Sequence, residues 1–364
     1  MAKNILRSNN AAVLIGNGTG FSTSDLGVEL YRLVQDFDYS IQLPRQESKE
    51  LGSQDFVFRG LMQQPDVSLN FSYIPEPALA NEQLSHFLDN TATSTFVNMF
   101  SGQENFNNNF YVISAPSGNQ NAIDSLSFDE DFFDLSGFDC IAFGNCFPQS
   151  YGISYGVGTL PMVSAGYICS NAVFENLTGE SMLMPSINLT GGNNDNVGRC
   201  LFQIDPAYGT DPANCPIVNP TNTGSSIVLQ NLEVGGQNLS GVHFVQSLDM
   251  SVELPRISSY GLGNDFAYNR KAQFPARGSF NVSSLVSGMD SGIMTGLLNQ
   301  TEDINYSFEL ALEVSGYKMI YQIEDAKLNS YNYAMTVNNM MSFSAGFGFE
   351  VTETKGLKMS GTLY

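Results

Sequence analysis

Two stretches of the chain, 211 residues apart, have nearly the same sequence. Ile41–Phe56 reads IQLPRQESKELGSQDF and Val252–Phe266 reads VELPRISSYGLGNDF, so Leu-Pro-Arg, Leu-Gly and Asp-Phe recur in the same order. At a second offset of 180, Ser150–Tyr167 aligns with Ser330–Phe347 over 18 positions without a gap, and six of these positions are identical. Two diverged copies of one domain explain both repeats.

The repeats also suggest where the two copies lie. A chain of 364 residues exceeds the roughly 100 to 200 residues of an ordinary domain, which favours two domains. We expect a first domain over residues 1–176, with an acidic loop inserted near 115–137. We expect a second domain over residues 177–364, with a loop inserted near 191–226.

Alternation of apolar and polar residues dominates the sequence and predicts strands with one buried face. In MSFSAGFGFEVT, residues 341–352, every odd position is apolar, and VSLNFSY, residues 67–73, alternates in the same way. Helical periodicity is confined to residues 78–90 and 283–300, one segment in each copy. The sequence therefore predicts a mainly β fold of antiparallel sheets, with one short α-helix per copy.

The charge of the chain narrows the classes of partner. The formal net charge is -21, because 36 acidic residues face only 15 Lys and Arg, although charged residues make up just 14% of the chain. Such a field repels nucleic acid and argues against tight DNA or RNA binding. No 18 apolar residues run together and no signal-peptide core is present, so we expect a soluble protein without a membrane partner.

The cysteines do not suggest a metal site. Their number is odd and no CxxC pair occurs, which argues against a zinc site or a disulfide framework. We expect buried or idle thiols, and a bridge between Cys200 and Cys215 is the alternative. The five residues are Cys140, Cys146, Cys169, Cys200 and Cys215.

No motif of a known catalytic type occurs. His86 and His243 stand apart from other candidate ligands, which favours structural roles. Paired carboxylates for glycoside hydrolysis converge only in the fold, so they stay open as an alternative, although the absence of Trp argues against a sugar site. We expect no enzymatic activity, no catalytic residue and no cofactor.

One acidic cluster has the composition of a calcium site. It lacks the EF-hand spacing and is interrupted by phenylalanines, so a solvated loop is favoured over Ca²⁺ binding and we expect no metal site. The cluster comprises Asp129, Glu130, Asp131 and Asp134.

The motifs in each copy resemble those of bacteriophage tail tube (major tail) proteins with two fused tube domains. They are LPRxxxxxLG with a following Asp-Phe, then a Pro and a Ser-x-Asn-x-Ser strand, residues 68–72 and 279–283. The segment IEDAKLNSYNYAMTVNNMMSFSAGFGFEVT, residues 323–352, adds to the likeness. The resemblance implies β-sandwich or split-barrel domains, each with a flanking helix. Three such chains would form a pseudo-six-fold ring, and stacked rings a hollow tail tube.

The resemblance also implies partners and a location. The chain would bind other copies of itself, a tape-measure protein, and tail terminator or distal tail proteins. Viral DNA would pass through the lumen without specific binding. The protein would be assembled in the host cytoplasm and reside in the tail of the virion.

By analogy with this family, the two repeated loops would contact a neighbouring subunit or ring. Arg45 and Arg256 are basic and repeated in a chain with few basic residues, so we predict that they pair with carboxylates across an interface. Local ion pairs within each domain are the alternative. The candidate interface residues are Pro44, Arg45, Leu51, Gly52, Asp55, Phe56, Pro255, Arg256, Leu262, Gly263, Asp265 and Phe266.

Two other classes of protein stay open. A different virion ring component, such as a collar or distal tail ring, or a surface adhesin would share the β-rich composition. An adhesin would use the inserted loops for host attachment. A calcium- or sugar-binding enzyme would instead be a monomer stabilised by its ligand.

Overall fold

The computed structural model describes the strands and several of the turns that join them. The described residues are 11–17, 28–31, 33–42, 45–49, 51–52, 56–61, 66–75, 97–100, 108–114, 139–157, 159–169, 171–176, 182–183, 199–200, 225–234, 237–238, 244–259, 269–285, 305–314, 317–334 and 342–361. Their regular structure is entirely β, which confirms the predicted fold class at this level.

The expected helices fall almost wholly elsewhere. Residues 78–90 lie outside the described part of the chain. The second expected helix, 283–300, is wrong at its start, because residues 283–285 end strand β19, and its remainder also lies outside. In those three residues, cross-strand pairing prevails over local helical periodicity.

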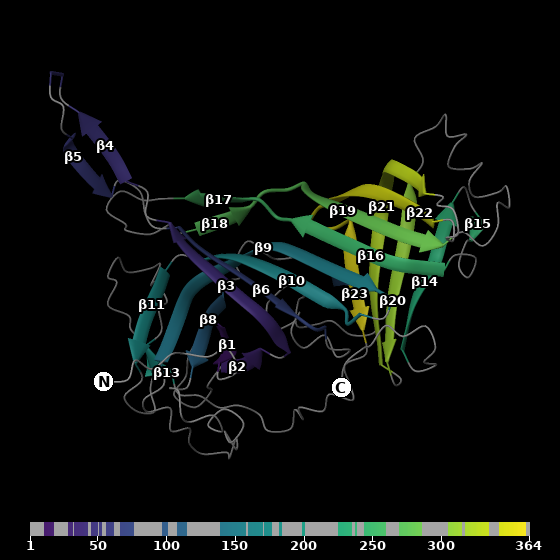
Figure 1. Cartoon of the computed structure of the whole chain (residues 1–364), viewed down its shortest axis with the longest axis horizontal. Helices are drawn as coiled ribbons and strands as arrows, with labels where there is room; N and C mark the ends of the chain where they lie inside the picture. The colour runs from purple at the N-terminus through teal and green to yellow at the C-terminus, as the bar shows by residue number, and fades with distance from the viewer. Residues whose placement is uncertain are drawn as a thin grey trace, which may run out of the picture.

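Eight antiparallel strands form a central sheet that runs across the molecule (Figure 1). Each strand is hydrogen-bonded to the next in the following order. The order is β3 (Val34–Gln42), β6 (Asp66–Tyr73), β10 (Met162–Cys169), β9 (Asp139–Gly156), β16 (Phe244–Glu253), β19 (Ala276–Leu285), β22 (Ser342–Val351) and β21 (Tyr317–Ala334).

Two lateral sheets grow from the first halves of β9 and β21, which are both 18 residues long. The first runs β2 (Val28–Tyr31), β1 (Ala11–Asn17), β8 (Asn108–Ser114), β9 and β11 (Asn171–Asn176). The second runs β15 (Gln237–Asn238), β14 (Ser225–Val234), β20 (Tyr306–Val314), β21, β23 (Leu357–Gly361) and β7 (Val97–Asn98). Each long strand therefore belongs to two sheets.

A left-handed residue marks the transition in each long strand. Asn145 in β9 has φ 51° and Asp325 in β21 has φ 55°, and the two lie 180 residues apart. Asn and Asp tolerate this conformation better than most residues, because their short polar side chains can bond locally. The offset found in the sequence therefore aligns a backbone feature as well.

Three short hairpins complete the described structure. They are β4 (Arg45–Lys49) with β5 (Phe56–Leu61), β17 (Arg256–Ser259) with β18 (Asn269–Ala272), and β12 (Met182–Leu183) with β13 (Arg199–Cys200). Figure 1 shows the β4–β5 hairpin projecting beyond the body of the molecule, whereas β17–β18 lies closer to the central sheet.

The hydrophobic core lies between the central sheet and the lateral sheets, and the predicted alternation places it correctly. In β6, Val67, Leu69, Phe71 and Tyr73 are buried, while Ser68, Asn70 and Ser72 face the other side. The odd positions of β22 from 345 to 351 are buried in the same way. Aromatic rings fill much of the space: Phe71 stacks on Tyr167 with ring centroids 5.5 Å apart.

The strand order of the first half of the central sheet is repeated by the second. The series β3-β6-β10-β9 is followed by β16-β19-β22-β21, and equivalent strands lie 211 or 180 residues apart. The registers also agree: Ser40 pairs with Ser68, and Ser251 with Ser279, with Oγ–Oγ distances of 2.7 and 2.8 Å. The domain limits at residues 176 and 177 remain a prediction.

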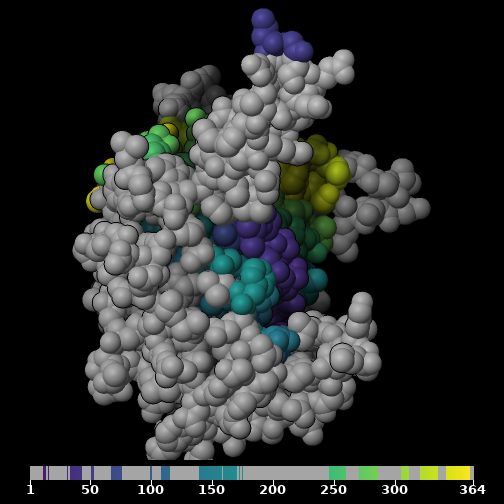
Figure 2. All heavy atoms as spheres, turned by 90° about the vertical axis from the view of Figure 1, so that its left-hand side faces the viewer, coloured from purple at the N-terminus to yellow at the C-terminus, as the bar shows by residue number. Residues whose placement is uncertain are grey.

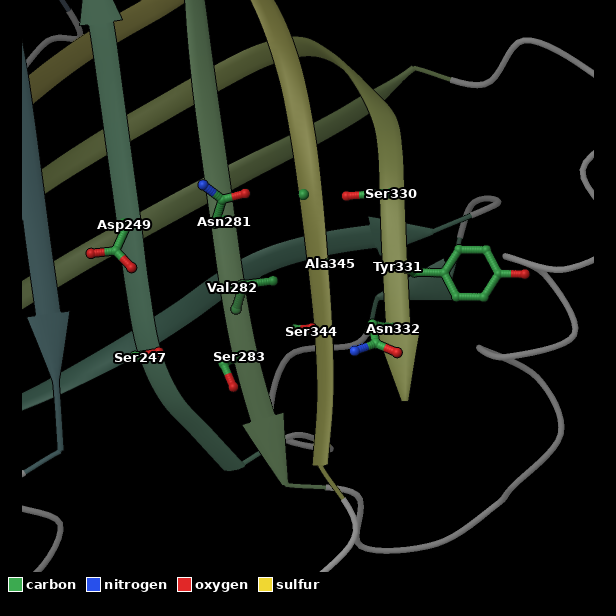
Figure 3. Close-up of a pocket in the computed structure, with 11 residues that line it drawn as sticks. Ser247, Asp249, Asn281, Val282, Ser283, Ser330, Tyr331, Asn332, Ser344 and Ala345 are labelled. Carbon is green, nitrogen blue, oxygen red and sulfur yellow. The ribbon is translucent and has the colours of Figure 1, made fainter. Parts of the chain in front are cut away.

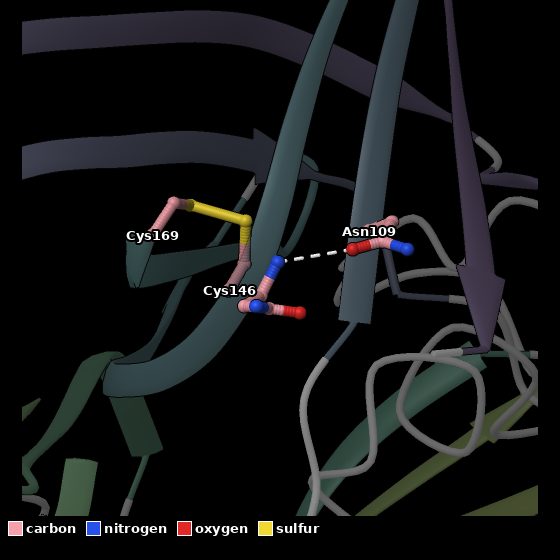
Figure 4. Close-up of a disulfide and its surroundings, with 4 residues drawn as sticks. Asn109, Cys146 and Cys169 are labelled. Carbon is pink, nitrogen blue, oxygen red and sulfur yellow. Dashed lines mark hydrogen bonds between the residues drawn. A yellow bond between two sulfur atoms is a disulfide. The ribbon is translucent and has the colours of Figure 1, made fainter. Parts of the chain in front are cut away.

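The prediction that the cysteines form no disulfide is wrong for one pair. Cys146 in β9 and Cys169 at the end of β10 form a disulfide, as Figure 4 shows. The antiparallel register sets Phe147 opposite Ile168, so the adjacent Cys146 and Cys169 face each other. Cys140 is a buried thiol outside this disulfide, as expected. The structure describes only the backbone of Cys200, and Cys215 lies outside the described residues.

Candidate assembly interface

The two halves of the central sheet meet at a strand pairing between β9 and β16. Tyr151 lies opposite Val252, and each side chain is only 1% exposed. Main-chain hydrogen bonds continue beyond both ends of the pairing, from Leu254 N to Gln149 O at 2.7 Å and from Val157 N to Gln246 O at 2.9 Å. We call this pairing the internal joint.

The outer edges of the central sheet are the equivalents of these two strands. β3 corresponds to β16, and residues 327–334 of β21 correspond to the second half of β9. In the described structure, β3 pairs only with β6, and residues 327–334 pair only with β22. Each edge thus presents main-chain donors and acceptors on one side, which makes it a template for another strand.

Apolar side chains at these edges are exposed where their equivalents are buried. Ile41 corresponds to Val252 and is 38% exposed, and Tyr331 corresponds to Tyr151 and is 44% exposed. Tyr39 and Tyr333 are half-buried, whereas their equivalents at the internal joint, Met250 and Ile153, are buried. The exposed Phe174 of β11 extends the patch, with its ring centroid 6.2 Å from that of Tyr39.

The face of the central sheet turned away from the core is polar, and most of its charged side chains are acidic. Exposed acidic side chains on this face outnumber basic ones. Among the side chains that the structure describes on this face, the exposed acidic residues are Asp36, Asp38, Asp249, Glu253 and Glu350, and the basic residues are the exposed Arg277 and the half-buried Lys327.

A row of four residues on this face occurs in both halves. Across neighbouring strands it reads Asp, Asn, Gly, Ser in each case. The second row lines a hollow of about 210 Å³, together with other serine and asparagine residues and with Val282, Tyr331 and Ala345. Figure 3 shows side chains that line this hollow. The rows are Asp38, Asn70, Gly166, Ser150 and Asp249, Asn281, Gly346, Ser330.

The glycine in each row stands where its neighbours leave no space for a side chain. A Cβ added at Gly346 would lie 2.8 Å from Asn281 Oδ1 and 2.9 Å from Ser330 Oγ, and one at Gly166 would meet the equivalent atoms of Asn70 and Ser150. The absence of a side chain lets the neighbouring polar groups approach across the strand. Each row therefore has no side chain at its glycine position, and its other three members are polar in both halves.

Arg256 ties the β17–β18 hairpin to the first half of the sheet. Its Nε donates to the carbonyl oxygen of Pro148 in β9, its Nη1 donates to Arg270 O at 2.8 Å, and its guanidinium lies 5.3 Å from the ring centroid of Phe147. Burial, followed by the like charge of Arg270, lowers the pKa of Arg256 to about 10. These contacts join the two halves within one chain, and pairing of Arg256 with a carboxylate across an interface remains a prediction.

The structure describes some of the other predicted interface residues. Leu51 and Gly52 form the turn after β4, where Leu51 is fully exposed and Gly52 has a φ of 91° that suits glycine. Figure 2 shows this tip standing clear of the surrounding surface. Pro255 is exposed, and Arg45 and Phe56 are described by their backbone in β4 and β5. The remaining candidates lie outside the described residues: Pro44, Asp55, Leu262, Gly263, Asp265 and Phe266.

Sequence reasoning missed the residues of the two outer edges. Ile41, Tyr331 and Tyr333 looked like ordinary apolar positions of alternating strands. The signal was present, because the offsets align them with Val252, Tyr151 and Ile153. Only the order of the strands separates the covered members of these pairs from the exposed ones.

Other predicted site residues receive no structural description. His86, His243 and the cluster from Asp129 to Asp134 lie outside the described residues. Within the described residues, no group of three His, Cys, Asp or Glu is placed to hold a metal ion. The same part of the chain includes no helix whose length and apolarity would let it cross a membrane.

The comparisons with known proteins add no relative. The sequence matches no protein-family model and no curated protein. The described residues form a mainly β protein with one large antiparallel sheet, in which the strand order of the central sheet's first half is repeated by its second.

Proposed function

We propose that this chain is a structural subunit of a phage tail tube, which assembles into rings through the outer edges of its central sheet. One observation carries the proposal: the internal joint buries Tyr151 and Val252, while their equivalents Tyr331 and Ile41 stand exposed on the two outer edges. A second copy that supplied β21 beside β3 would cover both. Closing the central sheet into a ring also pairs both of its open edges.

The number of strands fits a ring with an open channel. Three chains supply 24 strands to a closed barrel, because each central sheet has eight. Barrels of about 16 to 18 strands already leave an aqueous channel. One chain fills two neighbouring positions, so three chains give a pseudo-six-fold ring.

The polar face of the sheet suits a lumen through which DNA passes. It carries exposed carboxylates and serine and asparagine side chains, and few basic groups that would bind phosphates. Passage without specific binding follows from this chemistry. Stacked rings, a tape-measure protein in the lumen, and terminator or distal tail proteins at the ends belong to the same proposal, as does residence in the virion after assembly in the host cytoplasm.

Negative-stain electron microscopy of the purified chain, with particle mass measured alongside, tests the proposal. Hollow rings or tubes with three chains per layer are expected. Ile41→Asp and Tyr331→Asp should each prevent ring formation, because a charge replaces an apolar edge contact. Leu160→Asp, at an apolar position 43% exposed in the turn between β9 and β10, is the matched control and should still assemble. Compact oligomers without a channel would contradict the proposal and favour an adhesin or an enzyme.

A further inference from the structure

We propose that β21 of one chain pairs with β3 of a second copy in the same register as the internal joint. Tyr331 then lies opposite Ile41, and Tyr333 opposite Tyr39. On the polar face, Ser330 lies opposite Gln42, and Asn332 opposite Ser40. This inference rests on the proposed function and deepens it, because it assigns the residues that meet across the joint between chains.

The inference rests on strand registers in the first half of the central sheet that are repeated in the second half. Ser68 pairs with Ile168 in the first half, and Ser279 pairs with Gly348 in the second, which is the same register under the offsets. Gly166 pairs with Ser150, and Gly346 with Ser330, in the same way. With the pairing of β3 and β6 and that of β16 and β19, all three pairings inside a half are repeated without a shift.

The internal joint fixes the fourth pairing. It sets Val252 opposite Tyr151 and Met250 opposite Ile153. A one-residue slip between chains would turn the apolar edge residues to the polar face and the carboxylate of Asp38 toward the core. A two-residue slip would keep the faces, and the experiment below distinguishes it.

The joint between chains has more tyrosine than the internal joint. Tyr39 and Tyr333 replace Met250 and Ile153, and the ring centroid of Tyr333 lies 5.0 Å from that of Phe343. Tyrosine brings a large apolar surface together with a hydroxyl group that stays hydrated while the edge is free. The edges therefore stay soluble in the isolated chain and bury aromatic surface on assembly.

The polar face offers the closest cross-strand positions. At the internal joint, the main-chain bonds from Leu254 to Gln149 and from Val157 to Gln246 place the hydrogen-bonded pairs on the core-facing side. The non-hydrogen-bonded pairs, whose side chains approach more closely, are therefore on the polar face, such as Glu253 with Ser150. Gln42 and Ser330 are the equivalents of that pair and are both exposed.

Engineered disulfides test the register in the full chain. In the double variant Gln42→Cys and Ser330→Cys, mild oxidation should cross-link assembled rings into dimers and trimers on a non-reducing denaturing gel. Gln42→Cys with Asn332→Cys is the matched control: it keeps both thiols on the same face but displaces one by two residues. Diagonal neighbours lie about 7–8 Å apart, beyond disulfide reach, so this control should cross-link at least tenfold less. Each single variant controls for the native cysteines.

The outcomes separate the register from the ring. Rings in which the displaced pair cross-links better, or in which neither pair does, overturn the register and leave the ring proposal standing. A chain that stays monomeric and uncross-linked at high concentration overturns both. Cross-linking of the first pair alone, within rings, supports both.

Discussion

The hydroxyl groups of Tyr151 and Tyr321 lie 2.8 Å apart in the buried core and form a hydrogen bond. Tyr151 belongs to the second half of β9 and Tyr321 to the first half of β21, so the bond joins the two long strands of the repeat. The internal joint is therefore supported by its strand pairing and by contact with the second lateral sheet behind it.

This bond predicts a coupling between the two tyrosines. Either single change to Phe leaves one buried hydroxyl without this partner and should lower the free energy of unfolding by about 1–3 kcal/mol. The double change removes both hydroxyls and should cost less than the sum of the single changes. A double-mutant cycle by chemical denaturation measures this coupling. Additive losses would mean that the two hydroxyls do not interact.

The ring of Phe349 occupies the space that a side chain at position 278 would need, so we expect a strict requirement for glycine there. The ring lies over Gly278, where an added Cβ would meet three ring atoms, and Phe349 is buried. Gly278→Ala should therefore lower the free energy of unfolding by about 1–3 kcal/mol through overpacking. Adding Phe349→Leu should relieve part of the clash. Equal stability of Gly278→Ala and the natural chain would contradict the packing.

The first half of the sheet fills the space equivalent to that of Gly278 and Phe349 with different residues. Val67 and Cys169 occupy the positions of Gly278 and Phe349, and Cys169 bonds to Cys146, where the second half has Ala326. A larger residue in one strand is thus matched by a smaller one opposite. The bridge closes a loop with a sequence separation of 23, so its reduction should lower the free energy of unfolding by about 3 kcal/mol. Thermal unfolding with and without reductant measures the loss, and an unchanged transition would show that the bridge contributes nothing.

The two hydrogen bonds donated by the Arg256 guanidinium should hold the β17–β18 hairpin against the sheet, so the hairpin should detach when they are lost. A lysine at position 256 keeps the charge but cannot reproduce the planar pair of donors to Pro148 O and Arg270 O. Arg256→Lys should loosen β17–β18 and speed tryptic cleavage at the exposed Lys271 several-fold. Arg277→Lys, a change at an exposed arginine, is the control and should cleave at the natural rate. Equal cleavage of both variants would show that these hydrogen bonds do not hold the hairpin.

The lowered pKa of Arg256 also has a stability consequence. The folded pKa of about 10 lies below the ordinary value, so the unfolded chain binds the proton more tightly. The penalty of burying the charge is present below about pH 10 and is relieved as the pH rises above it. At neutral pH, the hydrogen bonds of Arg256 must offset this penalty.

Ionisation of the Tyr333 phenol at the proposed joint between chains should weaken assembly at alkaline pH. Burial, followed by the neighbouring Tyr331, raises the pKa of the Tyr333 phenol above its ordinary value of 10.0. Below pH 10 the phenol is neutral in both the assembled and the separated chain, and its contribution is fully present. This raised pKa belongs to the separated chain, and burial in the joint between chains would raise it further. The separated chain then ionises first, so ring stability should fall as the pH rises through its raised pKa.

Light scattering and tyrosinate absorbance, followed together during an alkaline titration, measure this effect. Rings of the natural chain should dissociate as tyrosinate appears. Tyr333→Phe keeps the aromatic surface and removes one of the phenols at the joint, so the assembled rings should persist to somewhat higher pH. Dissociation at the same pH in both proteins would contradict the proposal that the Tyr333 phenol is buried at the joint.

Local pattern was enough to predict the strands and the repeat. Alternation in β6 and β22 identified the buried faces because one side of each strand packs on the core. The offsets of 211 and 180 also identified which strands correspond. The pairing of Cys146 with Cys169 was missed, because it depends on the register of β9 and β10, which alternation does not set.

The candidate interface could be predicted only in part. The repeated Leu-Pro-Arg stretch predicted two loops that contact a neighbouring subunit or ring, which stays a prediction. Within the chain, Arg256 bridges the two halves of the sheet. The exposed edge residues were not distinguishable, since Ile41 and Val252 are both apolar and sit in equivalent sequence contexts. Their difference in exposure arises because, among the described strands, β16 has a neighbour on each side whereas β3 has one on a single side.

A cryo-electron microscopy reconstruction of the assembled particle would show directly whether the outer edges of the central sheet pair between chains. We expect layers of three chains, about 119 kDa for three copies of 39.7 kDa, with β21 of each chain hydrogen-bonded to β3 of the next around a 24-stranded wall. Layers in which the β3 and β21 edges remain unpaired, or particles closed without a channel, would contradict this expectation.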